Sequence, residues 1–324
     1  MGDAHVVMRP WLVTGAGGFI GARVCRRLCQ LGDRWVGLLR PGESPPSPPP
    51  GAPWPEGSFR VVDLCDSATA TDCVASIQPR AIINLAAVGV APAASTALPD
   101  FVLVNVLVPG VLLRALSEDA VLVQVGSMSQ YVARGEALAE DRTPCADATL
   151  YAWSKNAAET LLVTLAAQMN RALIRARLFG VIGPGEPPHR LLPSIVAGWR
   201  AARPVSLSDG RQVRDVLHVD DVATALVHVA RSASLVGKPV NVARGEGRTV
   251  RSMAERAAQR LGCERLLRFG DLPRRPGEAE HLVADVSRLR SSGFSPELSF
   301  DESIDLATDQ IAASEGHERA ERAR

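Results

Sequence analysis

Lysine and tyrosine are almost absent from this 324-residue chain, which contains two of each. One tyrosine and one lysine nevertheless stand four residues apart, in the segment Tyr151-Ala-Trp-Ser-Lys155. Two tyrosines scattered at random would place a lysine four positions downstream with a probability of roughly 1 %. The spacing therefore raises the question of whether these two side chains form a catalytic pair.

Other features are missing as well, and each absence excludes a class of protein. A net charge near +1 gives no electrostatic basis for binding nucleic acid or a membrane surface. The longest clean apolar runs are too short to span a bilayer, and we expect no secretion leader. The six cysteines include no C-x-x-C pair, and the six histidines form neither a cluster nor an H-E-x-x-H motif. These absences predict a cytoplasmic protein without a metal ion.

The first half of the chain alternates short runs rich in Val, Ile and Leu with stretches of helical periodicity. The strand-like runs are residues 11–15, 34–39, 59–64, 81–87 and 120–127. Such alternation is typical of a parallel sheet that helices cover on both faces. The predicted fold class is therefore α/β, a Rossmann-type doubly wound parallel sheet with a smaller C-terminal substrate-binding lobe.

A glycine-rich segment, Thr14-Gly15-Ala16-Gly17-Gly18-Phe19-Ile20-Gly21, follows the first strand-like run and opens the first helical stretch. Glycines let the backbone turn tightly and approach a pyrophosphate, while the N-terminus of the helix faces the anion. A glycine pattern alone is weak evidence, but the order strand, glycines, helix, strand is the context that dinucleotide binding requires. The predicted cofactor-binding residues here are Gly15, Gly17, Gly18, Phe19, Ile20 and Gly21.

The predicted domain boundaries follow from placing the dinucleotide site in the first half of the chain. We expect residues 1–180 to form the dinucleotide-binding Rossmann domain. Residues 181–311 are expected to form mainly the substrate-binding lobe, with a segment of about 214–245 returning to the large domain. Residues 312–324 are charged without an apolar face and are predicted to be a flexible tail.

The end of the second strand-like run bears on the choice of cofactor. An acidic residue there would accept hydrogen bonds from the ribose 2′-hydroxyl of NAD, but this run ends in Leu38-Leu39-Arg40. An arginine can hold a 2′-phosphate through charge-assisted hydrogen bonds. The sequence therefore favours NADP(H), with NAD(H) as the alternative if Arg40 is merely a surface residue.

The sequence around Tyr151 and Lys155 favours a catalytic role for this pair. The segment LYAWSKNAAETLLVTLAAQ has helical periodicity, so Tyr151 and Lys155 are predicted to share one helix face. An ammonium stabilises a nearby phenolate, so the pair can exchange a proton with an alcohol or carbonyl oxygen at neutral pH. Ser127 ends the fifth strand-like run and Ser129 lies two residues beyond it, at the sheet edge where ligands bind. Either hydroxyl could share the substrate oxygen, although a serine that forms a turn is an equally good interpretation.

Taken together, these motifs resemble the extended short-chain dehydrogenases/reductases, specifically the group of nucleotide-sugar epimerases, dehydratases and ketoreductases. The resemblance covers nearly the whole chain, and its specificity lies in the combination and order of the motifs. The segments that carry it are TGAGGFIG (14–21), Asp63-Leu64, NLAA (84–87), Asn105, GSMSQY (126–131), YAWSK (151–155), RLFGVIGPG (177–185), RDVLHVDDVA (214–223), Asn241 and RPGE (275–278).

The resemblance implies a role for each matching residue. Tyr151 would be the acid/base, Lys155 would orient the nicotinamide ribose and lower the pKa of the tyrosine, and Ser127 would be the third catalytic residue. Asp63 and Leu64 would contact the adenine, Ala86 and Ala87 would line the cofactor cleft, and Asn105 would support it. Arg214 and Arg275 would bind the diphosphate of the sugar nucleotide, and Ser127 and Ser129 would also contact the substrate. His218 and Asp221 would fix their loop. The resemblance also implies a homodimer.

Departures from the family pattern bear on the reaction. Family 4,6-dehydratases carry an Asp-Glu pair directly after the catalytic hydroxyl, where this chain has Met128 and Ser129. Dehydration by the usual route is therefore disfavoured. Gly180 replaces a frequent asparagine, which removes one expected substrate contact, and Asn84 replaces a frequent histidine.

Three functions remain open from the sequence. The leading hypothesis is an NADPH-dependent ketoreductase of a nucleotide-activated keto-deoxyhexose, acting at C4 in deoxysugar biosynthesis. The alternative is an NAD-dependent nucleotide-sugar 4-epimerase that uses the same residues. The third is a non-enzymatic dinucleotide-binding sensor, which the retained Tyr151–Lys155 pair disfavours.

Overall fold

The computed structural model describes residues 9–48, 51–89, 97–133, 135–275 and 277–322. These residues form two compact units. The first unit runs from the start of the described chain to Gln130 and includes Pro144–Arg177 and Ala223–Val240. The second unit consists of Tyr131–Thr143, Leu178–Val222 and the chain from Asn241 onward. The segment that returns to the first unit is thus shorter than expected, and the assignment of Tyr131–Thr143 to the second unit was not predicted.

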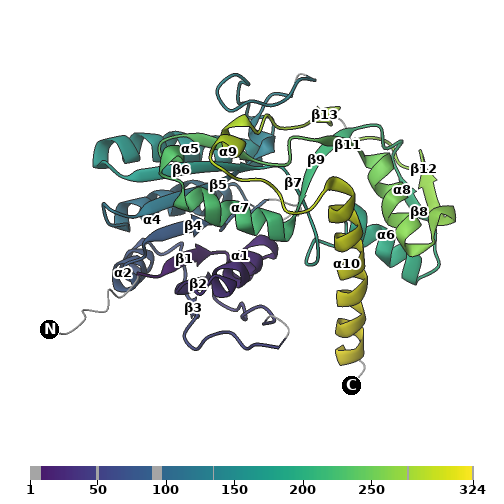
Figure 1. The fold of residues 1–324 in the computed structure, drawn as a ribbon. Coiled ribbons are helices and arrows are strands. Elements are labelled where there is room, and N and C mark those ends of the chain that lie inside the picture. Colours follow the sequence, from purple (N-terminus) through teal and green to yellow (C-terminus); the bar gives the residue numbers. More distant parts are fainter. Residues whose placement is uncertain (1–8, 49–50, 90–96, 134, 276, 323–324) are drawn as a thin grey trace. The chain divides into compact units, whose positions relative to one another are not determined.

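The first unit is built on a seven-stranded sheet in the order β10-β6-β5-β4-β1-β2-β3 (Figure 1). The pairs β1–β2, β1–β4, β2–β3 and β4–β5 are parallel. Because β1 pairs with β2 on one side and β4 on the other, the strand order reverses at β1, where this fold binds ligands. The strands are β1 (Trp11–Thr14), β2 (Trp35–Leu39), β3 (Phe59–Val61), β4 (Ala81–Asn84), β5 (Val121–Ser127), β6 (Ala172–Leu178) and β10 (Pro239–Val242).

Helices cover both faces of this sheet, as the α/β prediction requires. On one face lie α2 (Ser67–Ile77), α4 (Val108–Ala115) and α5 (Leu150–Met169), and α2 and α5 each pack against α4. On the other face lies α1 (Phe19–Gln30), together with the part of α7 (Val219–Arg231) that belongs to this unit. The doubly wound fold is therefore confirmed.

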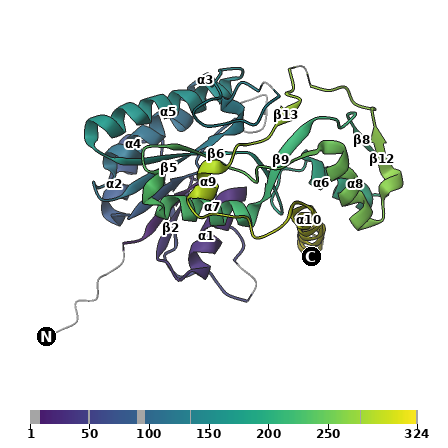
Figure 2. The same cartoon turned by 45° about the horizontal axis from the view of Figure 1, so that its top comes forward.

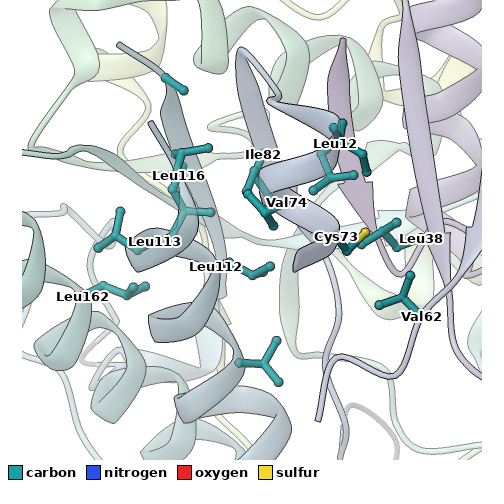
Figure 3. Packing of buried hydrophobic residues seen from close by; sticks show 14 of the residues in the cluster. Leu12, Leu38, Val62, Cys73, Val74, Ile82, Leu112, Leu113, Leu116 and Leu162 are labelled. Atoms are coloured by element: carbon teal, nitrogen blue, oxygen red, sulfur yellow. The ribbon is translucent and has the colours of Figure 1, made fainter. Parts of the chain in front are cut away.

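A layer of apolar side chains holds α2, α4 and α5 on the sheet (Figure 3). Leu12, Leu38 and Ile82 come from three neighbouring strands and are fully or almost fully buried. Leu112 of α4 and Leu162 of α5 pack into the same cluster. Burying one such side chain contributes about 1.5–3 kcal/mol, so this layer fixes the position of α5 and of Tyr151 and Lys155 at its start.

The helical run Leu98–Ala115 differs from the prediction that no apolar run is long enough to cross a membrane. It comprises α3 (Leu98–Asp100), the π-helical segment η1 (Phe101–Leu107) and α4, and its length and apolar character would suffice for a membrane span. In the structure, however, Asn105 in η1 is buried and donates a hydrogen bond to Ser154 of α5. Part of the run is therefore packed into the first unit, while Leu98, Leu103 and Leu107 are exposed.

The second unit contains a four-stranded sheet, a two-stranded sheet and a helical layer. β9 (Val213–His218) pairs with β7 (Gly180–Ile182), β11 (Gly247–Thr249) and β13 (His281–Leu282), while β8 (Val205–Leu207) pairs with β12 (Leu267–Phe269). The helices α6 (Leu191–Arg200), α8 (Val250–Leu261) and α10 (Phe300–Arg322) pack against one another (Figure 2). Short elements complete the chain: η2 (Met128–Gln130), η3 (Ala233–Leu235), η4 (Glu264–Leu266) and α9 (Ser287–Ser291).

The end of α10 differs from the predicted flexible tail. The helix continues through residues 312–322, and residues 323–324 lie outside the described chain. Its early turns carry Ile304, Ala307 and Ile311 into the apolar core of the second unit. The absence of an apolar face beyond residue 312 therefore did not end the helix.

Candidate active site

The glycine loop lies at the end of β1, where the strand order reverses. Gly15 has a φ of +63°, and a Cβ on this residue would lie 3.1 Å from the backbone of Leu85 and Ala86. A Cβ on Gly21 would lie only 2.0 Å from the carbonyl oxygen of Gly15. Helix α1 can therefore approach the loop only because these residues lack side chains. The cradle fits a dinucleotide, whose pyrophosphate requires this close backbone approach.

The N-terminus of α1 is available to an anion. Gly18 is the N-cap and offers no side chain to the first turn of the helix. The amide groups at the start of an α-helix have no intrahelical acceptor, and the helix dipole adds a partial positive charge there. Gly17, Gly18, Phe19 and Ile20 are thus placed where the prediction requires them, around an uncapped helix N-terminus.

A chain of buried polar groups explains Asn84. The Thr14 hydroxyl donates to Asn84 Oδ1 at 2.5 Å, and Asn84 Nδ2 donates to Gln124 Oε1 at 2.7 Å. These three residues are register partners on β1, β4 and β5. The Thr14 oxygen also accepts the backbone N–H groups of Leu85 and Ala86, at 3.1 Å each. Asn84 therefore fixes the loop between the strands instead of facing the substrate.

The remaining predicted cofactor residues lie at the same edge of the sheet. Ala86 and Ala87 are half-buried directly after β4, and Leu64 is half-buried shortly after β3. Asp63 is exposed, and its carboxylate accepts the backbone N–H of Cys65 at 2.9 Å. Arg40 is exposed directly after β2.

The π-helical segment η1 supports the catalytic helix. Asn105 accepts the backbone N–H of Val88 at 2.9 Å and donates to the Val88 carbonyl at 3.0 Å. Its amide also donates to the Ser154 hydroxyl at 2.9 Å, and that hydroxyl donates to the carbonyl of Tyr151. Asn105 thus links the loop after β4 to the first turn of α5.

Tyr151, Lys155 and Ser127 belong to the first unit. Thr149 caps α5 by accepting the backbone N–H of Ala152, so the helix begins directly before Tyr151. The Nζ of Lys155 lies 5.7 Å from the centroid of the Tyr151 ring and donates to the Val125 carbonyl at 3.0 Å. Val125 lies on β5, two residues before Ser127. The predicted pair therefore does lie next to the predicted strand end.

The hydroxyl of Ser127 is at the centre of a small polar group. It accepts the backbone N–H and the hydroxyl of Ser129, at 3.2 and 3.0 Å. A hydrogen bond with Ser127 also favours ionisation of the Tyr151 phenol. Both predicted serines are thus present, with Ser127 as the hydroxyl that reaches Tyr151 and Ser129 as its neighbour.

The electrostatics correct one prediction. Burial raises the pKa of Tyr151 to about 12, and the hydrogen bond with Ser127 only partly offsets this effect. Burial also lowers the pKa of Lys155 to about 8, an effect that the nearby negative charge of Glu159 opposes. The expectation that Lys155 makes the phenol unusually acidic is therefore wrong for the protein without cofactor. The physical reason is that desolvation disfavours the charged form of both groups, and the ammonium faces the Val125 carbonyl.

A buried ion pair behind this site was missed by the sequence analysis. Glu159 lies one turn after Lys155 on α5, and its carboxylate receives two hydrogen bonds from Arg177 of β6, at 3.0 and 2.7 Å. Gln130 donates to the same carboxylate at 2.9 Å and accepts the backbone N–H of Ser127 at 2.8 Å. The carboxylate thus acts through Gln130 on the position of the Ser127 backbone. The i,i+4 spacing of Lys155 and Glu159 was the only signal of this arrangement in the sequence.

The predicted substrate arginines belong to the second unit. Arg214 of β9 is mostly buried and binds the carboxylate of Glu278 at 2.7 Å and the carbonyl of Ala279 at 2.9 Å. Arg275, three residues before Glu278, is exposed. The structure thus places both arginines near one segment, with one of them already paired to a carboxylate.

His218 and Asp221 make hydrogen bonds within the second unit. The His218 ring accepts the backbone N–H of Asp220 at 3.2 Å and lies 3.1 Å from Gln310 Oε1. Asp221 accepts the backbone N–H of Glu297 at 3.1 Å. Both residues therefore fix the start of α7 within the second unit.

Gly180 has a packing reason that the sequence analysis did not recognise. A Cβ on Gly180 would lie 2.7 Å from the Asp215 carbonyl oxygen and 2.7 Å from Val216 Cγ1 on β9. The tight pairing of β7 with β9 therefore excludes an asparagine unless the strands separate. Within the described chain, no group of three or more His, Cys, Asp or Glu residues is placed to hold a metal ion.

Comparisons with known proteins identify the family of this chain. The profile of the NAD dependent epimerase/dehydratase family matches residues 11–243. The chain is 27% identical over 321 residues to a dTDP-glucose 4,6-dehydratase of Neisseria gonorrhoeae, which covers 90% of this chain and 92% of that protein. It is 26% identical over 341 residues to a dTDP-L-rhamnose 4-epimerase of Burkholderia thailandensis, with 90% and 92% covered. The UDP-glucose 4-epimerase of Thermus thermophilus, solved with NAD, is 27% identical with a TM-score of 0.77, and 93% of this chain and 98% of that chain are covered.

The buried Glu159–Arg177 pair makes a prediction about stability. Arg177→Gln would leave the Glu159 carboxylate buried without its bidentate partner, which we expect to lower the free energy of unfolding by about 3–5 kcal/mol. Urea unfolding measures this change. The control is Arg260→Gln, because Arg260 binds Asp309 in a half-exposed pair, and such pairs contribute less than about 1 kcal/mol. Equal losses in the two variants would contradict the prediction.

A second prediction concerns Lys155, whose replacement should increase the free energy of unfolding instead of lowering it. Burial lowers the pKa of Lys155 to about 8 in the folded protein, from 10.5 for a lysine in water, so at pH 7 folding has to bury a charged ammonium. Lys155→Met should therefore raise the free energy of unfolding at pH 7, by about 2 kcal/mol after the lost hydrogen bond is counted. Between pH 8 and 10.5 the unfolded protein binds the extra proton, so the wild type gains stability with rising pH and the advantage of the variant shrinks.

The matched control is Lys238→Met, because Lys238 is exposed and is the only other lysine. Urea unfolding of the three proteins at pH 7 and pH 10 measures the effect. A Lys155→Met protein that is less stable than the wild type at pH 7 would show that the ammonium is compensated in the folded state.

Proposed function

Because the chain belongs to the NAD-dependent epimerase/dehydratase family, a family of enzymes of the extended short-chain dehydrogenase/reductase type, we propose that it is a nucleotide-sugar 4-epimerase that uses NAD. The observation that carries the proposal is the arrangement of Ser127, Tyr151 and Lys155 at the end of β5, together with the absence of a carboxylate at positions 128 and 129. This set can move a proton to and from a sugar oxygen, and it offers no acid for the dehydratase route.

Each of these residues has a distinct task in the proposed reaction. The nicotinamide, when bound, supplies the hydride chemistry at the sugar carbon. Tyr151 takes the proton of the sugar hydroxyl during oxidation and returns it during reduction. Ser127 donates a hydrogen bond to the same sugar oxygen, and Lys155 would hold the ribose of the bound nicotinamide nucleotide. Burial raises the pKa of the phenol to about 12, and an oxidised nicotinamide, when bound, would supply positive charge that favours the phenolate.

The residues after Ser127 argue against dehydration. Met128 has no ionisable group, and the Ser129 hydroxyl donates to Ser127 Oγ at 3.0 Å. Loss of water from C5 and C6 requires a positioned acid and base, which these two side chains cannot supply. The dehydratases among the relatives are therefore evidence of shared ancestry and of a related substrate class, a nucleotide-linked hexose.

We assign the diphosphate of the substrate to Arg214 and Arg275. A planar guanidinium matches the oxygens of a phosphate. Arg275 is exposed, so its guanidinium can bind an anion that arrives from solvent. Arg214 is held by Glu278 in the structure. Binding of the substrate would therefore replace, or share, this carboxylate partner with the diphosphate.

The second candidate is a reductase. An NADPH-dependent 4-ketoreductase of a keto-deoxyhexose would use the same three catalytic residues, and one observation favours it. Arg40 is exposed directly after β2, where a guanidinium can bind a 2′-phosphate. The two candidates differ in what happens to the cofactor, because an epimerase regenerates it in each cycle and a reductase consumes it.

The test is to incubate the purified enzyme with UDP- and dTDP-linked hexoses and, separately, with their 4-keto-6-deoxy forms and NADPH. We expect interconversion of C4 epimers without net change in absorbance at the nicotinamide band. Stoichiometric loss of NADPH with a 4-keto sugar, and no epimer formation, would instead establish the reductase. Release of water with formation of a 4-keto-6-deoxy sugar would overturn both.

The two tyrosines allow a matched test of the proton transfer. Tyr151→Phe should lower turnover by about 10²–10⁴-fold, the range of general acid–base catalysis, while the affinity for NADH changes little. Tyr131→Phe is the control, because the Tyr131 hydroxyl donates to Asn241 Oδ1 at 2.6 Å in the core of the second unit. This variant should lose stability but keep most of its turnover per folded molecule. Full activity of Tyr151→Phe would contradict the assignment.

We further propose a cytoplasmic homodimer. All six cysteines are free, which supports a reducing compartment. Exposed apolar side chains lie on the adjoining helices η1 and α5, at Leu103, Leu107 and Val163, and burying them against a second copy would stabilise a dimer. Light scattering of the purified protein should give twice the 34.4 kDa mass of the chain. A double variant, Leu103→Asp with Leu107→Asp, should give the monomer mass, and an unchanged mass would exclude this surface.

A further inference from the structure

The chain turns sharply directly after β2, at Arg40-Pro41-Gly42-Glu43. The backbone N–H of Glu43 donates to the Arg40 carbonyl at 3.0 Å, and Gly42 has a φ of +81°. Proline at the second position and glycine with positive φ at the third are typical of a type II β-turn. Local sequence therefore determines this turn, which places Glu43 beside the end of β2.

The carboxylate of Glu43 lies against the glycine loop. A Cβ on Gly17 would lie 2.7 Å from Glu43 Cδ and 2.8 Å from its Oε1. Only a residue without a side chain at position 17 leaves room for this approach. Oε2 of Glu43 accepts the backbone N–H of Arg40 at 3.2 Å. The half-buried carboxylate is thus in a defined place between the glycine loop and the end of β2.

The position of the Glu43 carboxylate determines which of the two cofactors, NAD(H) or NADP(H), it can favour. In a fold of this type, the pyrophosphate of the cofactor is bound by the glycine loop and the adenosine ribose lies toward the end of β2. A carboxylate there can accept hydrogen bonds from ribose hydroxyls. It also repels a 2′-phosphate, which brings additional negative charge into a partly desolvated site.

Arg40 has the opposite preference but a less fixed position. Its side chain is exposed after the last residue of β2, whereas its backbone N–H holds the Glu43 carboxylate. The arginine can therefore attract a 2′-phosphate only while the phosphate also approaches Glu43. We propose that Glu43, a residue outside the glycine motif and beyond the end of β2, makes this protein select NAD(H) over NADP(H). The proposal rests on the dinucleotide site of the proposed function.

The experiment measures cofactor binding without any sugar. Wild type, Glu43→Gln and the control Glu56→Gln are stripped of bound nucleotide, and their dissociation constants for NADH and NADPH are measured by fluorescence titration. Glu56 is an exposed residue later in the same loop, so its replacement removes one negative charge away from the glycine loop. Thermal unfolding confirms that all three proteins are folded.

We expect the wild type to bind NADH on the order of tenfold more tightly than NADPH, or better. Glu43→Gln should reduce that ratio by a similar factor, mainly by improving the affinity for NADPH, and Glu56→Gln should leave it unchanged. Adding Arg40→Ala to Glu43→Gln should remove the gained affinity for NADPH. High salt should reduce the wild-type preference, because screening weakens the repulsion.

Three outcomes would overturn the proposal. They are a wild type that prefers NADPH, a ratio that Glu43→Gln does not change, and equal effects of Glu43→Gln and Glu56→Gln. A Glu43→Gln protein that fails to fold is replaced by Glu43→Ala, for which the same ratio is predicted to fall. Because no sugar is present, a failure of the proposed epimerase reaction would leave these ratios as they are, and the two hypotheses fail separately.

Discussion

The carboxylate of Glu159 is the buried charge on which the catalytic arrangement depends. It lies on the same helix as Lys155 and Tyr151, and Arg177 binds it in a bidentate pair. Through Gln130 it also fixes the backbone of Ser127. A buried carboxylate without such partners would be very costly, so this group ties α5 to β6 and, through Gln130, to the turn after β5.

The same burial shifts the pKa values of Tyr151 and Lys155. Lys155 is desolvated, and the negative charge of Glu159 limits the fall in its pKa. Tyr151 remains a weak acid in the protein alone, because burial outweighs its hydrogen bond with Ser127. In the proposed reaction, positive charge from a bound oxidised cofactor would favour the ionised form of this phenol.

At the adenosine end of the proposed cofactor site, we propose that Glu43, at the end of the turn after β2, has a larger effect on cofactor preference than Arg40. Arg40 stands where cofactor preference is usually decided, yet the Pro41-Gly42 turn brings the Glu43 carboxylate against Gly17. Gly180 and Asn84 also depart from the family pattern, and each has a structural explanation. Close packing against β9 accounts for Gly180, and a hydrogen bond to Gln124 on the neighbouring strand accounts for Asn84. Residues that differ from the family sequence pattern at these two positions thus stabilise the packing of the strands.

The sequence by itself determined the features that depend on local order. Strand and helix periodicity gave the doubly wound sheet, the glycines marked the end of β1, and the four-residue spacing put Tyr151 and Lys155 on one face of α5. Only the tertiary structure decided which groups are desolvated and which distant residues meet. Glu159 and Arg177 are 18 residues apart, and Glu43 and Gly17 lie on different loops. The direction of the Tyr151 pKa shift and the pairing of Arg214 with Glu278 depend on such contacts, because burial and charge act through space rather than along the chain.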